Sequence, residues 1–287
     1  SGGTTICEIL QILAPYPLGK WGYGSADALH YMVEAERRAF ADRNSDLGDP
    51  TFVHDPVEEL ISPQHAAALR ASIRADEATP SSQIKGHLAT LEGNDTTDYS
   101  VVDAHGNAVA VTYTINFLFG SGYIAGDTGF FLNDEMDDFT SKPGVPNAFG
   151  LVQGTANRIE PGKRPLSSMS PTIVLHGKQL YMVTGSPGGS TIISTTLESF
   201  LNAAEFGMNV QQAVNAPRVH QQWYPDKVFV EPGLMTPAVQ RRLEKMGYRF
   251  KQVKSWGADE AILVDPKTHL LEGANDRRRP AGLAAGY

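Results

Sequence analysis

The chain has 287 residues, of which 41% are hydrophobic and 20% are charged. This length and apolar content are enough for one large domain or two small domains with a buried core. The formal net charge is -8 and no extended basic stripe occurs, which argues against a nucleic-acid partner. The single cysteine excludes an intramolecular disulfide. No apolar run is long enough for a transmembrane helix, so we expect no membrane span in this chain.

The first part of the chain is predicted to be helical. Apolar spacing indicates helices over residues 6–14, 26–43 and 62–75, and Ser25 and Ser62 are suitable N-caps for the last two. These segments predict a small helical layer before any strand occurs.

Polar residues in this helical part have structural interpretations. We expect His30, beside an apolar helix face, to be a packed residue and not a ligand. The loop 44–56 lacks the spacing of a calcium loop, so its aspartates are expected in solvated turns. Residues 76–95 are poor in apolar side chains and rich in turn formers, which is typical of a linker.

A β-hairpin is predicted directly after this linker. Its strands, 97–102 and 108–114, are rich in Val, Thr and Tyr, and its turn contains Asp, Gly and Asn. Thr96 precedes the first strand, at the rim of a sheet, where chemistry is often placed. If the chain is cut before Thr96, this residue gains a free α-amine beside its hydroxyl, which is one form of an activated nucleophile. By itself, a threonine pair at a strand start is more often ordinary strand composition.

The rest of the chain alternates strands, turns and helices. An acidic loop is followed by a Pro- and Gly-rich segment, 142–154, with the composition of a surface loop or lid. A second hairpin over 172–184, the glycine-rich turn 185–190 and a helix over 191–206 come next. Further helices are expected at 210–216 and 237–246, and strands at 228–231, 248–253, 261–264 and 270–273. Hairpins followed by helices predict an α+β fold with antiparallel sheets.

Two motifs could bind negative charge. The backbone N–H groups of Gly188 and Gly189, before a helix, suit a transient oxyanion, although a tight turn that lets strand and helix pack closely explains them equally well. Ser167 and Ser168, near Arg164, could donate to a carboxylate or could cap a strand.

The acidic loop has several possible roles. Its carboxylates could form a glycosidase acid–base pair, ligate a divalent cation, bind a substrate ammonium group, or simply face solvent. The residues concerned are Asp134, Glu135, Asp137 and Asp138.

Together these pieces are what an amino-acid-like acyl donor requires, and they occur in a familiar order. The motifs are Thr-Thr-Asp-Tyr-Ser-Val-Val-Asp, Leu-Asn-Asp-Glu-Met-Asp-Asp-Phe, Pro-Leu-Ser-Ser-Met-Ser-Pro-Thr, Gly-Ser-Pro-Gly-Gly-Ser and the final Ala-Gly-Tyr. The chain closely resembles the γ-glutamyltranspeptidases over its whole length. The resemblance implies that residues 1–95 end the family's large subunit and that 96–287 form the complete small, catalytic subunit. It also implies an N-terminal-nucleophile hydrolase with a four-layer αββα sandwich.

The activity implied by this resemblance is that of a γ-glutamyltransferase or glutathione hydrolase. The precursor would cleave itself between Asp95 and Thr96, and Thr96 would then form a γ-glutamyl acyl-enzyme with glutathione or another γ-glutamyl donor. Water, an amino acid or a peptide would accept the acyl group, and the 143–154 loop would act as a lid. The family also suggests a periplasmic or extracellular location.

The resemblance assigns further site residues. Thr96 would use its own α-amine as the general base, and Thr114 would hold the Thr96 hydroxyl. Gly188 and Gly189 would form the oxyanion hole. The donor's α-amine would be bound by Asn116, Glu135 and Asp138, and its α-carboxylate by Ser167 and Ser168. No cofactor and no metal are expected.

The chain departs from the family pattern in two ways. Position 98 is Asp, where histidine usually follows the threonine pair. The part of the large subunit that should supply an arginine for the substrate carboxylate is missing, so the remainder of the large subunit is an expected partner. Two alternatives stay open: a glutaryl-type cephalosporin acylase of the same fold, against which Asp138 argues, and a non-catalytic homologue that acts as a binding module.

Overall fold

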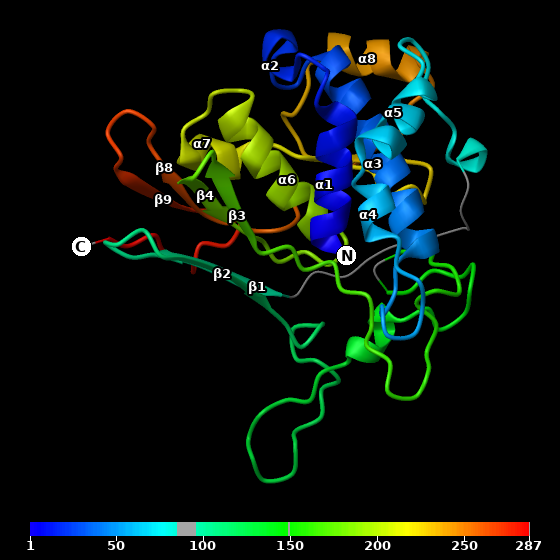
Figure 1. The fold of residues 1–287 in the computed structure, drawn as a ribbon, viewed down its shortest axis with the longest axis vertical. Helices are drawn as coiled ribbons and strands as arrows, with labels where there is room; N and C mark the ends of the chain where they lie inside the picture. The colour runs from blue at the N-terminus through cyan, green and yellow to red at the C-terminus, as the bar shows by residue number, and fades with distance from the viewer. Residues whose placement is uncertain (85–95, 149, 287) are drawn as a thin grey trace. The chain divides into compact units, whose positions relative to one another are not determined.

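The computed structural model describes residues 1–84, 96–148 and 150–286. The chain forms two compact units (Figure 1). The first unit comprises Ser1–Gly93, Glu135–Ser167 and Pro217–Lys254; the second comprises Asn94–Asp134, Ser168–Ala216 and Ser255–Tyr287. The first unit therefore takes residues from both sides of the predicted subunit boundary at 95/96. That boundary is the predicted cleavage site, and it stays a prediction, since Asp95 lies outside the described residues.

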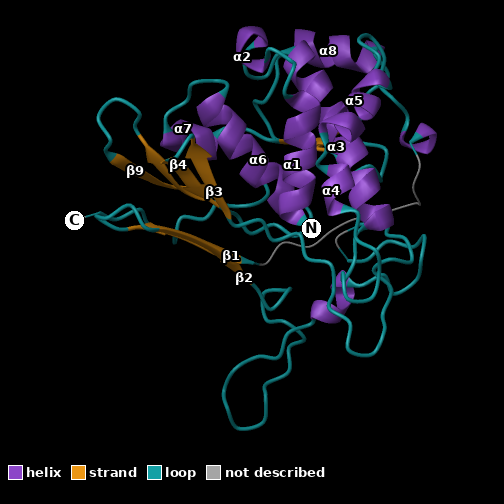
Figure 2. Cartoon of the chain, viewed as in Figure 1, coloured by secondary structure: helices purple, strands orange, loops and turns teal. Residues whose placement is uncertain are grey.

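The first unit is mainly helical (Figure 2). Its elements are α1 (Gly2–Leu13), α2 (Leu18–Trp21), α3 (Ala26–Asp46), α4 (Val57–Leu60), α5 (Pro63–Ala71), η1 (Ser81–Gln83), η2 (Glu135–Asp138), β5 (Val219–His220), β6 (Val228–Val230), α8 (Pro237–Lys245) and β7 (Phe250–Gln252).

The predicted N-caps of α3 and α5 are confirmed. The Ser25 hydroxyl accepts a hydrogen bond from the Ala28 N–H at 3.2 Å, and the Ser62 hydroxyl accepts from the His65 N–H at 3.1 Å. Each cap satisfies one amide of the first helical turn, which otherwise lacks an acceptor. Both helices therefore begin at fixed residues, and so do the side chains that they carry.

The small sheet of the first unit corrects one expectation. Its strand order is β5-β6-β7, and β6 and β7 pair in parallel, whereas we predicted antiparallel sheets. The physical reason is the connection: α8 lies between the two strands in sequence, and a helical crossover brings the second strand back in the same direction. The short strand β5 was not predicted, because two residues carry no detectable periodicity.

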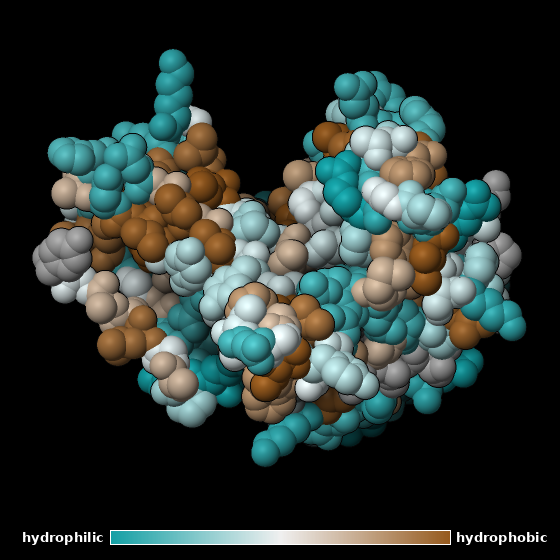
Figure 3. Space-filling view, turned by 90° about the horizontal axis from the view of Figure 1, so that it is seen from below, coloured by the Kyte–Doolittle hydropathy of each residue, from teal (hydrophilic) through white to brown (hydrophobic). Residues whose placement is uncertain are grey.

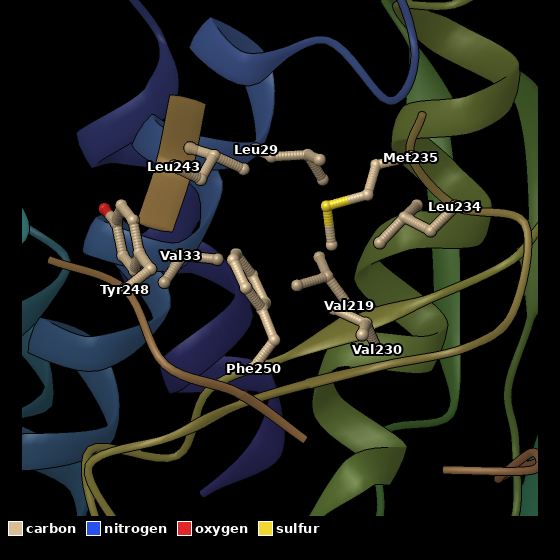
Figure 4. A pocket seen from close by; sticks show the side chains of 9 residues that line it. All are labelled: Leu29, Val33, Val219, Val230, Leu234, Met235, Leu243, Tyr248 and Phe250. Atoms are coloured by element: carbon tan, nitrogen blue, oxygen red, sulfur yellow. The ribbon is translucent and has the colours of Figure 1, made fainter. Parts of the chain in front are cut away.

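The interior of the first unit combines an apolar region with buried polar side chains. A pocket between α3, α8 and the small sheet is lined by Leu29, Val33, Val219, Val230, Leu234, Met235, Leu243, Tyr248 and Phe250 (Figure 4). The Tyr248 hydroxyl lies 2.6 Å from Nδ1 of His30 and donates to the Glu34 carboxylate at 3.0 Å. The other His30 ring nitrogen lies 2.8 Å from the Arg74 carbonyl oxygen, so His30 is the structural residue that the sequence predicted.

The second unit contains the two predicted hairpins. Its elements are β1 (Thr97–Val102), β2 (Ala108–Tyr113), β3 (Thr172–His176), β4 (Gln179–Thr184), α6 (Thr191–Ala204), α7 (Val210–Asn215), β8 (Glu260–Val264) and β9 (Leu271–Asn275). The hairpin β1-β2 forms one sheet, and β3-β4-β8-β9 form a fully antiparallel second sheet.

Helices α6 and α7 cover one face of the four-stranded sheet. Met182, Ala261 and Leu263 from the sheet pack with Ala203 and Val214 from the helices in one buried cluster. The hairpin lies at the other face, where the Ser100 hydroxyl donates to the Glu260 carbonyl at 3.0 Å (Figure 1). This unit therefore has a helix layer and two sheet layers. Nowhere in the described residues is there a helix with the length and apolarity needed to cross a bilayer.

Candidate active site

The β1-β2 hairpin brings two threonine hydroxyls together. Because Thr97 pairs with Tyr113, Thr96 and Thr114 leave the hairpin at the same end, away from its turn. The Thr96 hydroxyl donates to the Thr114 hydroxyl at 3.3 Å. Thr114 Oγ1 in turn accepts from the Asn116 N–H at 2.8 Å. Thr96 is 9% exposed, so its hydroxyl lies in a largely desolvated position at the rim of the sheet.

Asn116 is fixed by the beginning of the acidic loop. Its backbone has φ 75°, in the left-handed region that asparagine tolerates better than most residues. Its side-chain amide donates to the Asp134 carbonyl at 3.2 Å, and the Asp134 carboxylate accepts from the Phe117 N–H at 3.1 Å. These bonds fix Asn116 next to Thr114, whose hydroxyl accepts from its N–H.

The C-terminal segment also contacts the threonine pair. Arg279 Nη1 donates to the Thr96 carbonyl oxygen at 2.8 Å. The neighbouring Arg278 pairs with Asp276 and donates to the Ala216 carbonyl at 2.9 Å. No sequence signal indicated the contact that Arg279 makes, because 183 residues separate the two partners.

The glycine turn 185–190 connects β4 to α6. Gly188 and Gly189 both have positive φ, of 146° and 56°. A Cβ at Gly188 would lie 2.6 Å from the Thr191 hydroxyl, so a larger residue there collides with the helix start. The Gly188 carbonyl accepts from both the N–H and the hydroxyl of Thr191. Within the described residues, the N–H groups of Gly188 and Gly189 have no hydrogen-bond acceptor, which leaves two donors before the helix.

Asp98 links the hairpin to the glycine turn. A Cβ at Gly185 would lie 2.3 Å from Asp98 Oδ1, so the Asp98 carboxyl occupies the space of a side chain at 185. Asp98 Oδ1 accepts from the Thr112 hydroxyl, and Oδ2 is buried without a hydrogen-bond partner among the residues that the structure describes. Burial, with a smaller contribution from the charge of Asp259, raises the pKa of Asp98 to about 7.

The acidic residues Glu135 and Asp138 belong to η2 of the first unit. Burial and then the charge of Glu135 raise the pKa of Asp138 well above its usual range, while the buried Arg43 opposes this shift. The Asp138 carbonyl accepts from the Asn157 amide at 2.7 Å. The Glu135 and Asp138 carboxyl groups are influenced by one guanidinium, that of Arg43. Two carboxyl groups beside one cation favour the binding of a further cation over that of an anion. Sequence reasoning did not identify Arg43.

The predicted lid is hydrogen-bonded to the rest of the first unit at two places. The Gly154 N–H donates to the Asn44 carbonyl at 2.7 Å, and Leu151 and Val152 are buried. At the other side, the Asp137 carboxylate accepts from the Ala148 N–H at 3.0 Å. The segment therefore packs on the end of α3, and residue 149 lies outside the described residues.

The two predicted serines lie at the junction of the units in sequence. The Ser167 carbonyl accepts from the Ser1 hydroxyl at 2.5 Å, and the Ser168 carbonyl accepts from the Ser170 hydroxyl at 2.8 Å. Arg164 is engaged elsewhere, in a two-bond pair with Asp49 at 3.0 and 2.8 Å. The expectation of solvated aspartates was therefore wrong for Asp49, whose pKa Arg164 holds well below the usual range.

Comparison with known proteins decides the family. The family model described as "Gamma-glutamyltranspeptidase" matches residues 1–286. The chain is 50% identical over 295 residues to the "Glutathione hydrolase proenzyme" of Pseudomonas sp. (strain A14), which covers 100% of this chain and 51% of the relative. The chain belongs to the γ-glutamyltranspeptidase family.

Solved structures of the family agree with this assignment. The T380A mutant of the Helicobacter pylori γ-glutamyltranspeptidase is 51% identical, has a TM-score of 0.62, and matches 64% of this chain with 100% of its own. A cephalosporin acylase from Bacillus halodurans has a TM-score of 0.78 over 96% of this chain and 48% of its own, but at 24% identity it shows the α+β fold alone. The chain spans about half the length of the curated relatives that it matches first.

In this family member the predicted site residues fall into two groups. Thr96, Thr114 and Asn116 are joined by hydrogen bonds within the second unit, which also holds Gly188, Gly189 and Ser168. The first unit holds the other three, namely Glu135, Asp138 and Ser167.

Proposed function

We propose that this chain is part of a γ-glutamyltransferase or glutathione hydrolase in which Thr96 is the nucleophile. The observation that carries the proposal is the hydrogen bond between the Thr96 and Thr114 hydroxyls, at a strand start, in a chain of this family. The names of the relatives support the substrate, glutathione, and the word "proenzyme" supports maturation by cleavage.

Cleavage between Asp95 and Thr96 is the first step of the proposal. The Thr96 hydroxyl attacks the preceding carbonyl carbon, the peptide bond breaks, and water hydrolyses the resulting ester. Thr96 is then left with a free α-amine, whose ordinary pKa of about 8 leaves a useful fraction unprotonated near neutral pH. The match between 64% of this chain and the whole Helicobacter pylori chain supports this boundary, because residues 96–287 make up about two thirds of the chain.

Turnover then follows a two-step acyl transfer. The α-amine of Thr96 accepts the hydroxyl proton as Oγ1 attacks the γ-carbonyl of the donor, and the amine product leaves with a proton. The acyl ester passes to water, an amino acid or a peptide. The N–H groups of Gly188 and Gly189 stabilise the oxyanion, a contribution of about 3–4 kcal/mol per donor in comparable sites.

The donor's own charges are bound by the remaining residues. Asn116, Glu135 and Asp138 bind the α-amine, and Ser167 and Ser168 bind the α-carboxylate. The raised pKa of Asp138 supports this role, since a substrate ammonium supplies the positive charge that favours the ionised carboxylate. Two hydroxyl donors are a weak site for a carboxylate, so we expect a guanidinium from the rest of the protein to complete it.

The β1-β2 hairpin has an exposed apolar face, on which we expect the rest of the protein to pack. The outer face of the β1-β2 hairpin exposes Tyr99, Val101, Val109 and Tyr113 by 47–57% each. Figure 3 shows apolar side chains gathered at the left of the view, where Figure 1 places this hairpin. We propose that the remaining half of the protein packs here and completes a four-layer αββα sandwich, of which the second unit supplies three layers.

The test is a comparison of two substrates with the full-length protein. A γ-glutamyl anilide should be hydrolysed faster than a glutaryl anilide, because only the first has the α-amine that Asp138 binds. Thr96→Ala should abolish turnover, a loss on the order of 10³-fold or more, while Thr96→Ser should keep part of it. Faster turnover of the glutaryl substrate would favour an acylase, and equal turnover in Thr96→Ala would remove the mechanism.

A further inference from the structure

Three side chains from three helices of the first unit converge outside the candidate active site. Glu8 lies on α1, Asp42 on α3 and His65 on α5, and these helices lie side by side (Figure 1). Nε2 of His65 is 2.8 Å from Asp42 Oδ2 and 3.5 Å from Glu8 Oε1. The three atoms all lie within 4.8 Å of one another.

Glu8 makes this cluster more than a surface ion pair. It is 1% exposed, and its Oε1 receives no hydrogen bond within the described part of the chain. A buried carboxylate oxygen without a hydrogen bond is costly, so it requires either a proton or a nearby cation. Oε1 lies 3.5 Å from Nε2 of His65. Asp42 and His65 are each about one-fifth exposed, which leaves a path for a small ligand from solvent.

The surroundings of the cluster are negative. Asp46, on the last turn of α3, and Glu59, on α4, add two more carboxylates. The pKa of Asp46 is raised by burial and by the charges of Asp42 and Glu59. Arg70 of α5 donates instead to the Gln11 carbonyl at 2.6 Å. A cation at the cluster therefore meets favourable charge from several helices.

We propose that Glu8, Asp42 and His65 form a binding site for one divalent transition-metal ion, with Zn²⁺ as the best match. Zinc takes imidazole nitrogen and carboxylate oxygen at about 2.0–2.2 Å, which places neighbouring donors of a tetrahedral site about 3.4 Å apart. The observed separations of 2.8 and 3.5 Å bracket this value. Water from the exposed side completes the fourth position.

The metal joins α1, α3 and α5, so its role is to stabilise the helical layer. The Ser62 cap supports it, since the N–H that this hydroxyl binds belongs to His65 itself. The site shares no residue with the proposed catalytic machinery, and it does not depend on the proposed function. The three ligands are far apart in sequence and form no motif, which explains why the sequence predicted no metal.

Protons compete with the metal for the same atoms. The neighbouring carboxylates of Glu8 and Asp42 raise the pKa of His65 to about 9, and burial raises that of Glu8 well above its usual range. Metal ligands of this kind bind in their deprotonated forms. Binding of M²⁺ therefore releases protons from the cluster. The apparent affinity should therefore rise with pH.

The test uses the full-length protein, stripped with a chelator and titrated with ZnCl₂. We expect one equivalent of bound zinc by elemental analysis, and a rise in Tm that is larger at pH 8 than at pH 6.5. Glu8→Gln and His65→Gln should each lose the bound zinc and the rise in Tm. His105→Gln, which removes an exposed histidine outside the cluster, should retain both.

Other results would overturn the proposal. If the wild type binds no stoichiometric zinc, or if Glu8→Gln binds as much as the wild type, the cluster holds only protons. Should either variant fail to fold, the zinc content and pH dependence of the wild type still decide. None of these readouts uses catalysis, so a failure here leaves the proposed transferase function untouched.

Discussion

In the proposed mechanism, the hydroxyl of Thr114 positions Thr96 through the hydrogen bond that it accepts from the Thr96 hydroxyl. Thr114→Ala removes the acceptor, and Thr114→Ser keeps it. A hydrogen bond of this kind contributes about 1 kcal/mol, so we expect kcat to fall about fivefold in Thr114→Ala and to change little in Thr114→Ser. Steady-state kinetics with a γ-glutamyl anilide measures the difference. Equal kcat in the two variants would show that the hydroxyl does not position the nucleophile.

Asp98 makes the stability of the folded chain depend on pH. Its pKa is about 7 in the folded state and about 3.9 in an unfolded chain. Between these values the folded state keeps a proton that the unfolded state has released. Stability is therefore lost as pH rises from about 4 to about 7, and the loss is complete above that range.

The variant Asp98→Asn has no such proton to lose. At pH 8 it should unfold at a higher temperature than the wild type, and the difference should shrink toward pH 4. Each unit by which the pKa differs between the folded and unfolded states corresponds to about 1.4 kcal/mol. This value sets the order of magnitude of the difference in stability between the variant and the wild type. Thermal unfolding across this range measures the effect. The same difference in Tm at every pH would mean that Asp98 is ionised throughout.

The connection between β1 and the glycine turn depends on Gly185 having no side chain. Gly185→Ala would place a Cβ 2.3 Å from Asp98 Oδ1, and overpacking of this kind costs about 1–3 kcal/mol. Gly3→Ala is the matched control, because its Cβ meets nothing within 4 Å. Denaturant unfolding should show a loss for the first variant only. Adding Asp98→Ala should restore part of that loss, and no restoration would place the clash elsewhere.

Local signals predicted most of the elements correctly. The caps at Ser25 and Ser62 located two helices, and the alternation of Val, Thr and Tyr located both hairpins. The parallel pairing of β6 with β7 was missed because it depends on the crossover through α8, and no local pattern records strand direction.

Contacts between distant residues were beyond sequence reasoning. Arg279 reaches the Thr96 carbonyl, and Arg43 lies in the field of Asp138. Neither a run of arginines nor a polar residue within a helix has a sequence pattern that indicates which distant residue it contacts. The glycine turn and the threonine pair were found because their chemistry is carried by adjacent residues, and the family resemblance supplied the roles that spacing alone leaves open.

For the molecule as a whole, the exposed apolar face of the β1-β2 hairpin predicts an interface. Val101→Lys together with Val109→Lys should weaken association with the remaining half of the protein, because two charges would lose their hydration on burial. Leu283→Lys is the control, since that side chain is 84% exposed and lies outside the hairpin. Co-purification of separately tagged halves measures the association. Undiminished co-purification of the double variant would place the interface elsewhere.

The cut before Thr96 is the central claim, because without it the nucleophile has no base of its own. The most direct measurement is N-terminal sequencing and intact mass of the purified full-length protein, beside its Thr96→Ala variant. The account predicts a fragment that begins at Thr96 in the wild type and an uncut chain in the variant. A mature wild-type protein in which Asp95 is still joined to Thr96, but which turns over γ-glutamyl substrates, would contradict it.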